Sequence, residues 1–362
     1  MERRIIITGT HLTPALELIR QLQTDSKNNW KIFYIGRLSN SNDPKLFSIE
    51  SKVIPTLGID FYPIPCGKFD RRFLPNSILG LPKTISGLYQ SFNLVKRLKP
   101  NIIVSFGGYV SVPVIISGWL QKINSITHEQ TLTNSLTTKI NSRFVKKIAL
   151  SFNNPLQINQ LPKDKIVVTG NLLRFQLFQK TAVSNSKFKF PNPKLPLIFI
   201  TAGNQGSHAI NLVIKQVLPK LVNFNIIHQT GKNDYSLFKT LNKKYPNYQA
   251  SEYFSTPDYA WIIQHSNVFV SRAGANTCQE IVAFGKKSIL IPLPKSQQDE
   301  QNLNAFWVKK MLPKNTIVIN QDKLDQNYLS KSIDSLIKQT STASKKNYQP
   351  NLELLKLINE NI

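Results

Sequence analysis

Cysteine is scarce in this chain, and its scarcity excludes several classes of protein. The 362 residues include two cysteines, Cys66 and Cys278, far apart in the sequence. A disulfide-stapled scaffold is therefore excluded, and the usage suits a reducing compartment. The sequence contains no H-E-x-x-H motif, no Asp-x-Asp pair and no G-x-S-x-G motif. We therefore expect no metal, no cofactor and no serine-hydrolase chemistry.

Acidic residues are also few: 20 Asp and Glu stand against 46 Lys and Arg, a formal net charge of +26. Such a charge attracts nucleic acid, an anionic membrane surface or a phosphate-bearing substrate. The basic residues are scattered rather than grouped, and zinc-finger spacings and aromatic RNA-binding motifs are absent. We therefore expect no nucleic-acid partner. A nucleotide bias of the genome is an alternative origin of the excess Lys and Asn.

Long hydrophobic runs are nearly absent. The N-terminus has only a three-residue Ile run and does not read as a signal peptide. Residues 102–120 form a 19-residue stretch without a charge, long enough for a membrane helix. Gly107, Gly108 and Pro113 interrupt it, so we interpret it as a buried strand, a turn and a helix. The chain is expected to be soluble or peripheral to a membrane.

Apolar strand-like runs recur along the whole chain, each followed by a turn and a helix-compatible stretch. Examples are "RRIIIT" and "NIIVSF" in the first half and "LPLIFITAG" and "NVFVSRAG" in the second. This alternation predicts an α/β fold with two doubly wound, Rossmann-like parallel sheets that face each other across a cleft. The expected domains are 1–165, 166–340 and a C-terminal helical segment, 341–362, that packs back on the first domain. Ligands of such sheets bind at the carboxyl ends of the strands.

Four turns at predicted strand ends contain glycine or small residues: "TGTHLTP", "SFGGYVSVP", "TAGNQGSHAIN" and "SRAGANTCQE". Each could present free backbone N–H groups at a helix N-terminus, where phosphate binds well. Singly, such turns are common in proteins, and none is a complete G-x-G-x-x-G. Together, in a basic chain, they predict a diphosphate ligand in the cleft.

Polar side chains near these turns have more than one interpretation. Glu280 could accept hydrogen bonds from ribose hydroxyls or be an ordinary helix-surface carboxylate. Gln301 could contact a sugar or cap a helix. His128, Glu129 and Gln130 follow a predicted strand directly, which is the most enzyme-like cluster of the first half.

In this order, the segments "SFGGYVSVP", "HEQ", "TGNLLR", "AGNQGSHAIN", "HQTG", "SRAGANTCQE", "ILIPLP" and "DEQNLNA" resemble the undecaprenyldiphospho-muramoylpentapeptide β-N-acetylglucosaminyltransferase family, from Ile5 to about Asn320. The resemblance implies a GT-B fold and an inverting, metal-independent hexosyltransferase. Such an enzyme moves GlcNAc from UDP-GlcNAc to the MurNAc 4-hydroxyl of lipid I, giving lipid II for peptidoglycan and cell-wall synthesis. The resemblance also implies a peripheral position on the cytoplasmic face of the cell membrane.

The resemblance also implies roles for individual residues. On the donor side it implies contacts with UDP-GlcNAc from Arg174, Asn204, Gln205, Arg272, Ala275, Asn276, Thr277, Glu280 and Gln301. On the acceptor side it implies contacts from Thr10, Gly107, Gly108, Tyr109, Ser111 and Thr131. His11 is the first candidate for the general base, since a histidine can take a proton near neutral pH. Glu129 is the second.

The chain departs from the family pattern at several places. The first turn, "TGTH", is short and has one glycine, "HEQT" replaces HEQN, "GNLLR" replaces GNPVR, and "AGNQGS" replaces GGSQGA. A related UDP-sugar transferase with another lipid acceptor, or a UDP-sugar-binding homologue without turnover, therefore stays an alternative.

A lipid acceptor implies contact with an anionic membrane surface. Residues 68–100 combine Lys and Arg with apolar residues, and Trp119 is implied to lie near them; the apolar members are Phe73, Leu74, Ile78, Leu79 and Leu81. This composition is typical of an interfacial segment. A buried helix face is the alternative interpretation.

Overall fold

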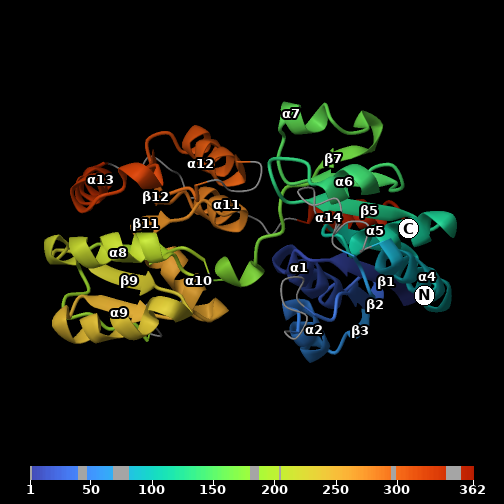
Figure 1. Cartoon of the computed structure of the whole chain (residues 1–362), viewed down its shortest axis with the longest axis horizontal. Helices are drawn as coiled ribbons and strands as arrows, with labels where there is room; N and C mark the ends of the chain where they lie inside the picture. Colours follow the sequence, from blue (N-terminus) through green and yellow to red (C-terminus); the bar gives the residue numbers. More distant parts are fainter. Residues whose placement is uncertain are drawn as a thin grey trace. The chain divides into compact units, whose positions relative to one another are not determined.

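Two α/β units divide the chain: Met1–Leu172 with Pro350–Ile362, and Leu173–Gln349. Figure 1 shows a layer of strands with helices beside it in each unit. The computed structural model describes residues 2–39, 47–67, 81–179 (backbone only for 81–83), 187–203, 205–294, 299–339 and 352–362.

The first sheet is parallel throughout, with strand order β3-β2-β1-β4-β5-β6-β7. Its strands are β1 (Glu2–Gly9), β2 (Asn29–Gly36), β3 (Asp60–Pro63), β4 (Ile102–Phe106), β5 (Ser125–Glu129), β6 (Lys147–Leu150) and β7 (Ile166–Val168). Its helices are α1 (Leu12–Gln23), α2 (Ile49–Val53), α4 (Leu81–Leu98), α5 (Ser111–Leu120), α6 (Leu136–Asn141), α7 (Pro155–Ile158) and α14 (Glu353–Asn359). Chain order reverses between β1 and β4, so the turns after these two strands leave one sheet edge side by side.

The second sheet has the same winding, with order β10-β9-β8-β11-β12-β13. Its strands are β8 (Leu197–Thr201), β9 (Asn225–Gln229), β10 (Tyr248–Ser251), β11 (Val268–Ser271), β12 (Lys287–Leu290) and β13 (Thr316–Val318). Its helices are α8 (His208–Val217), α9 (Lys232–Lys244), α10 (Thr256–His265), α11 (Ala275–Ala283), α12 (Glu300–Met311) and α13 (Gln326–Lys338). The prediction of two doubly wound parallel sheets is confirmed.

The sheets are apolar on both faces because alternate residues of each strand pack against different helices. In β1, Ile5 and Ile7 pack with α1 and α14, whereas Ile6 packs with α4 and α5 on the other face. In β8, Ile198 and Ile200 pack with α8 and α13, and Phe199 faces α10 and α11. This double covering explains why the strands read as continuous apolar runs.

The first unit extends beyond residue 165 and includes a C-terminal helix. It extends to Leu172 because β7 pairs with β6 as the edge strand of the first sheet. It also includes α14, whose Leu354, Leu357 and Ile358 are buried with the β1 face. Of the expected C-terminal segment 341–362, residues 341–351 lie outside the described residues.

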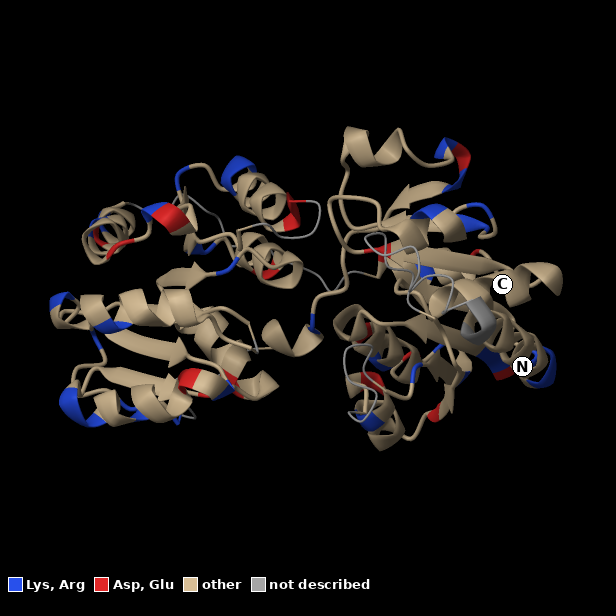
Figure 2. Cartoon of the chain, viewed as in Figure 1, with Lys and Arg blue, Asp and Glu red and all other residues tan. Residues whose placement is uncertain are grey.

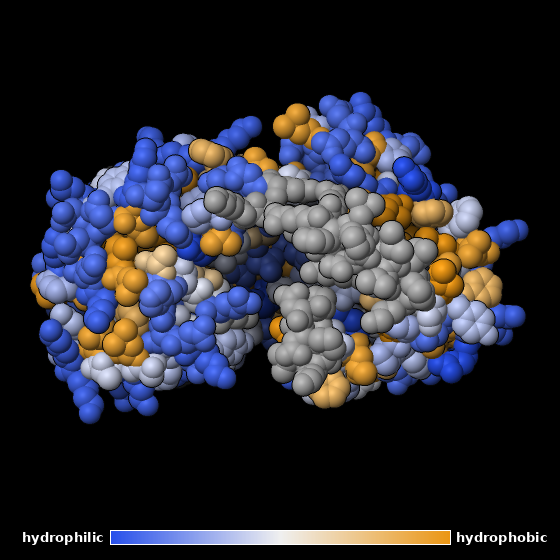
Figure 3. Space-filling view, in the orientation of Figure 1, coloured by the Kyte–Doolittle hydropathy of each residue, from blue (hydrophilic) through white to orange (hydrophobic). Residues whose placement is uncertain are grey.

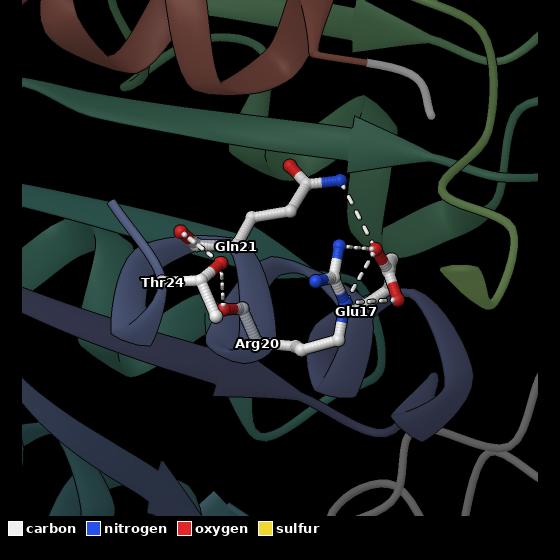
Figure 4. A network of polar contacts seen from close by, with 4 residues as sticks. All are labelled: Glu17, Arg20, Gln21 and Thr24. Carbon is white, nitrogen blue, oxygen red and sulfur yellow. Dashed lines mark hydrogen bonds and ion pairs between the residues drawn. The ribbon is translucent and has the colours of Figure 1, made fainter. Parts of the chain in front are cut away.

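Helix α1 carries a charged network although most of its surface is buried. Glu17 is 4% exposed, and its Oε1 accepts hydrogen bonds from Arg20 Nη2 at 2.7 Å and Gln21 Nε2 at 3.2 Å. Figure 4 shows both side chains turned toward this carboxylate, with Thr24 donating to the Arg20 carbonyl one turn on. Because the buried charge is paired and hydrogen-bonded, α1 tolerates it.

Among the described residues, no helix is both long enough and apolar enough to cross a bilayer. The uncharged stretch 102–120 forms β4, a turn and α5, as interpreted from its glycines. Figure 3 shows a mostly hydrophilic face with separate apolar patches, and Figure 2 shows Lys and Arg on both units.

Candidate active site

The turns after β1 and β4 interlock at the carboxyl edge of the first sheet. The N–H of Thr10 donates to the Gly107 carbonyl, with an N···O distance of 3.1 Å. Gly108 has φ +79°, and a Cβ there would overlap the Thr10 side chain; a Cβ on Gly9 would lie 2.7 Å from the Phe106 carbonyl carbon. Gly9 and Gly108 are therefore required by the packing of the chain itself. Their presence does not by itself identify a phosphate site.

His11 lies at this junction and precedes α1. A Cβ on Gly107 would be 3.3 Å from Nε2 of the imidazole, so this nitrogen is close to the β4 turn. The other ring nitrogen, Nδ1, lies 2.7 Å from Nε2 of Gln130. Burial lowers the pKa of His11, although the charge of Glu129 acts in the opposite direction. The imidazole is therefore neutral at pH 7 and can accept a proton.

Glu129, the second candidate base, is buried and fully engaged by the segment that follows it. Its Oε1 accepts hydrogen bonds from the N–H and hydroxyl of Thr131, at 3.2 and 2.8 Å. Its Oε2 accepts from the Ser135 N–H at 3.0 Å and the Thr138 hydroxyl at 2.7 Å. The carboxylate thus organises the chain from β5 to α6, and it places a negative charge near His11.

Ser111 and Thr131 use their hydroxyls inside the unit. The Ser111 side chain is fully buried; its hydroxyl donates to the Gly108 carbonyl at 2.9 Å and accepts from Asn141 Nδ2 at 3.1 Å. The Thr131 hydroxyl lies 2.7 Å from the Thr133 carbonyl as well as 2.8 Å from Glu129. Both residues shape the backbone of the edge.

In the second unit, Arg272 joins the turns at the carboxyl ends of several strands. Its Nη1 donates to the carbonyls of Ile291 and Pro292, each at 3.1 Å, after β12. Its Nη2 donates to Ser207 Oγ at 2.7 Å before α8 and to Gln321 Oε1 at 2.6 Å after β13. These acceptors are all neutral, and burial lowers the Arg272 pKa. Within the described part of the chain, this buried cation has no carboxylate in an ion pair.

Glu280, on α11, is part of a second polar group in this unit. Its Oε1 lies 3.1 Å from Nη2 of Arg174, and its Oε2 accepts a hydrogen bond from the Tyr259 hydroxyl at 2.6 Å. The Arg174 guanidinium carbon is 4.8 Å from the centre of the Tyr259 ring. Burial would lower the pKa of Arg174, but Glu280 and Tyr259 outweigh it and raise that pKa. Arg174 and Glu280, 106 positions apart, are thus brought together.

The first turn of α11 is open. Gly274 has φ −67°, and a Cβ built on it would meet no atom of the described residues within 4 Å. Neither backbone conformation nor packing therefore demands glycine at this position. Directly after it, the helix begins with Ala275, Asn276 and Thr277.

The remaining donor candidates lie on other turns. Gln205 is exposed, and its backbone packs closely against Gly231 at the turn after β9. Gln301, on α12, accepts a hydrogen bond from the Leu293 N–H at 2.9 Å. Asn204 lies outside the described residues.

Comparison with known proteins agrees with this architecture. Residues 6–150 match the glycosyltransferase family 28 N-terminal domain, and residues 197–362 match the glycosyltransferase family 28 C-terminal domain. The chain belongs to glycosyltransferase family 28. A relative within this family is the UDP-N-acetylglucosamine--N-acetylmuramyl-(pentapeptide) pyrophosphoryl-undecaprenol N-acetylglucosamine transferase of Clostridium botulinum strain Langeland, 32% identical over 92% of this chain and 91% of that protein. The transferase of the same name from Clostridium tetani is 31% identical over 96% of this chain and 95% of that protein.

Solved structures share the fold of this chain. MurG of Acinetobacter baumannii superposes with a TM-score of 0.71 at 21% identity, covering 99% of each chain. The UDP-GlcNAc 2-epimerase of Neisseria meningitidis, bound to UDP-GlcNAc, superposes with a TM-score of 0.64 at 15% identity, covering 100% of this chain and 99% of that chain. The expected GT-B fold and family membership are confirmed.

Three residues to which the family resemblance gives no role lie beside the candidates in the structure of this family 28 protein. Gln130 contacts His11, Tyr259 contacts Glu280, and Arg37 contacts Tyr109. Gln130 was visible in the "HEQ" segment, and Arg37 follows a predicted strand directly. Nothing in the local pattern indicated Tyr259, which lies on the apolar side of α10.

Proposed function

We propose that this chain transfers GlcNAc from UDP-GlcNAc to lipid I, the undecaprenyl-diphosphate-linked MurNAc-pentapeptide, and so forms lipid II. The observation that carries the proposal is the 32% identity to the named C. botulinum transferase over 92% of the chain. That likeness spans both units. The transfer requires a site that binds a nucleoside diphosphate and a base that takes the hydroxyl proton. Polar groups at the carboxyl edge of the second sheet suit the diphosphate, and those at the carboxyl edge of the first sheet include a candidate base.

We place the donor diphosphate at the carboxyl edge of the second sheet. Arg272 is a buried cation with neutral acceptors, and an unpaired buried charge is unfavourable. A diphosphate nearby would provide the opposite charge. The open space at Gly274 lets phosphate oxygens approach the first N–H groups of α11, where the helix dipole favours an anion. The other proposed contacts along these turns are Asn204, Gln205, Ala275, Asn276 and Thr277.

The ribose and sugar contacts are assigned to longer side chains. Each carboxylate oxygen can accept more than one hydrogen bond, so Glu280 can bind ribose hydroxyls while Tyr259 holds its orientation. Arg174 can exchange Glu280 for the phosphates, because a guanidinium binds two phosphate oxygens side by side. Gln301 is assigned to the GlcNAc hydroxyls.

In the first unit we assign His11 as the general base. The MurNAc 4-hydroxyl gives its proton to Nε2 while its oxygen bonds to C1 of GlcNAc. The C1–O bond to the diphosphate breaks on the opposite face, and UDP leaves with the electron pair, so the configuration at C1 inverts. The negative charge of Glu129 stabilises the imidazolium that results.

Gln130 sets which nitrogen of His11 is basic. For Nε2 to take a proton, Nδ1 must carry the hydrogen of the neutral ring. The Gln130 amide faces Nδ1 with its nitrogen, and its buried oxygen has no hydrogen-bond partner in the part of the chain that the structure describes. Rotation of the amide by half a turn would let that oxygen accept Nδ1–H. We propose that this rotated arrangement is the reactive one.

The lipid diphosphate is assigned to the turn after β4, with Thr10, Gly107, Gly108 and Tyr109 around it. Helix α5 begins directly after this turn, and the partial positive charge of its N-terminus favours an anion there. Ser111 and Thr131 act indirectly, since their hydroxyls hold the backbone. Glu129 likewise supports the site as an acceptor and a charge.

We further propose that the chain is peripheral and binds the cytoplasmic face of the membrane. Four apolar side chains of the packed helices α4 and α5 are exposed: Ile85, Tyr89, Trp119 and Leu120. Beside Trp119 a cavity of about 480 Å³ is lined by Lys122, Arg143, Lys146, Lys147 and Lys165, which suits anionic headgroups. The expected contacts Phe73, Leu74, Ile78 and Leu79, and the side chain of Leu81, lie outside the described residues. Loss of binding to anionic vesicles in Tyr89→Ser tests this assignment.

The test of the function is transfer of labelled GlcNAc from UDP-GlcNAc to a short-chain lipid I analogue. His11→Ala should lower kcat by about 10²–10⁴-fold with UDP affinity unchanged, and Glu280→Ala should weaken UDP binding. Glu252→Ala, which removes an exposed carboxylate, is the matched control and should behave as wild type. A wild-type protein that binds UDP-GlcNAc but transfers nothing to the analogue would refute the proposed acceptor.

A further inference from the structure

Arg37 is a cation at the carboxyl edge of the first sheet that the mechanism above leaves unused. It follows β2, which pairs in parallel with β1, so it leaves the sheet at the same edge as His11. Its Nε donates to Oε1 of Glu50 at 2.7 Å. The Glu50 side chain is 3% exposed, whereas that of Arg37 is 22% exposed. A buried carboxylate therefore fixes one side of a guanidinium that reaches solvent.

A second contact holds the guanidinium against the turn after β4. The Arg37 guanidinium carbon is 6.0 Å from the centre of the Tyr109 ring. Burial would lower the pKa of Arg37, but hydrogen bonds with Tyr109 and Glu50 outweigh it and raise that pKa. Arg37 is therefore always charged, and it is oriented from both α2 and the β4 turn. This positioning reduces the side-chain entropy that binding a ligand would cost.

The contacts within the unit use only part of its hydrogen-bonding capacity. A guanidinium has five N–H donors. Within the described part of the chain, Glu50 and Tyr109 are the recorded partners of Arg37. Because Nε is the atom bound to Glu50, Nη1 and Nη2 keep donors, beyond the one that contacts Tyr109, for another anion. The fork of a guanidinium matches two phosphate oxygens in spacing and charge.

We propose that Arg37 binds the diphosphate of the lipid acceptor beside the Gly107–Tyr109 turn, an inference that rests on the proposed function. The diphosphate and the attacking hydroxyl are both attached to the same MurNAc ring, so the cation that binds the diphosphate must lie near the base that accepts the hydroxyl proton. Strands β2, β1 and β4 are neighbours in the first sheet. Arg37, His11 and the Gly107–Tyr109 turn follow these strands, in that order, at the same edge. The UDP diphosphate offers the same chemistry, and the test separates the two sources.

The test compares Arg37→Gln with Arg37→Lys and with the double variant Arg37→Gln/Glu50→Gln, in which Glu50 is not left as a buried charge. Arg3→Gln is the matched control, because Arg3 also lies over an aromatic ring, that of Trp30 at 5.7 Å, but at the opposite end of β1. Three values are measured on the full chain: the KM for the lipid I analogue, the KM for UDP-GlcNAc, and the Kd of a short-chain polyprenyl diphosphate without sugar.

We expect Arg37→Gln and the double variant to raise the acceptor KM and the diphosphate Kd by about 10- to 100-fold. The acceptor KM and diphosphate Kd of Arg37→Lys should lie between those of the Gln variants and wild type, because lysine keeps the positive charge but lacks the paired N–H donors of a guanidinium. The UDP-GlcNAc KM and the control should not change. An unchanged polyprenyl diphosphate Kd in both Gln variants, or a change confined to UDP-GlcNAc, overturns the inference. Wild type that binds the polyprenyl diphosphate through Arg37 but transfers no GlcNAc refutes the proposed function and leaves the Arg37 site standing.

Discussion

Glycine residues at the two sheet edges are present for different physical reasons. Gly9 and Gly108 have positive φ and lie where a Cβ would meet neighbouring chain, so the fold itself requires them. Gly274 has an ordinary φ, and a Cβ on it would meet no atom within 4 Å among the residues that the structure describes. Of these three glycines, only Gly274 is left to be explained by something outside the chain, such as a ligand against its backbone.

Gly274→Ala should therefore separate binding from stability. Alanine fits the backbone at φ −67°, so the free energy of unfolding should change by less than about 1 kcal/mol. A methyl group in the space of a phosphate should weaken UDP binding by about tenfold or more. Calorimetric titration with UDP and thermal unfolding of the same preparation measure both quantities.

The control is Gly58→Ala, because Gly58, which precedes β3 in the first unit, has φ +71° and a Cβ on it would meet no described atom within 4 Å. That variant should lose stability and keep its UDP affinity. Equal UDP affinity in Gly274→Ala and wild type would show that the space at α11 holds no part of the donor.

Gln130 gives a prediction about pH. The titratable groups whose charges act on His11 are Glu129 and His128, both on β5. Because burial lowers the His11 pKa, activity should persist below pH 6.5 and fall as the ring becomes protonated. Gln130→Glu places a carboxylate at Nδ1, in addition to the nearby charge of Glu129. It should raise the His11 pKa and move the acid limb of the kcat/KM profile to higher pH.

Gln130→Leu removes the partner of Nδ1 and should lower kcat at least about tenfold without raising the acid limb. The measurement is kcat and kcat/KM for the acceptor from pH 5 to 9. A Gln130 that serves only as packing would instead leave the kcat of Gln130→Leu close to that of wild type, and that result would exclude the tautomer assignment.

At the scale of elements, the sequence is informative wherever a strand packs on both faces. The runs around Ile5 to Ile7 and Ile198 to Ile200 are apolar without interruption because helices cover both sides, and this pattern is local. Residues 102–120 could likewise be assigned to a strand, a turn and a helix, because the glycines that interrupt the stretch are also a local pattern. The sequence placed a boundary at residue 165, just before the edge strand β7, which pairs with β6; three residues carry little pattern.

The candidate sites depend on pairs that local patterns do not contain. Arg174 and Glu280 are 106 positions apart, and His11 and Gln130 are 119 apart. The parallel sheets bring such residues together at strand ends, so the sequence indicated which turns matter but not which side chains meet there. Resemblance to the family supplied several of these residues, whereas Tyr259 and Arg37 emerged only from the contacts.

At the scale of the whole molecule, the chain enters the second unit after Leu172 and returns to the first at Pro350. The returning helix α14 completes the core beneath β1: Ile358 is fully buried with Ile5 and Ile7, and Asn359 accepts a hydrogen bond from Arg3 at 2.6 Å. The last residues of the chain should therefore stabilise the unit that contains its first strand.

Ile358→Ala should destabilise the first unit by about 2–5 kcal/mol, the usual cost of a cavity at a fully buried isoleucine. Leu352→Ala, at a side chain 55% exposed, should have almost no effect. Thermal unfolding with and without UDP distinguishes the units, since a ligand stabilises only the unit that binds it. The transition that does not respond to UDP should shift downward in Ile358→Ala, while the UDP-dependent transition stays in place. A fall in UDP affinity together with the loss of stability of the first unit would contradict this prediction. It would show that folding of the first unit and UDP binding by the second are coupled.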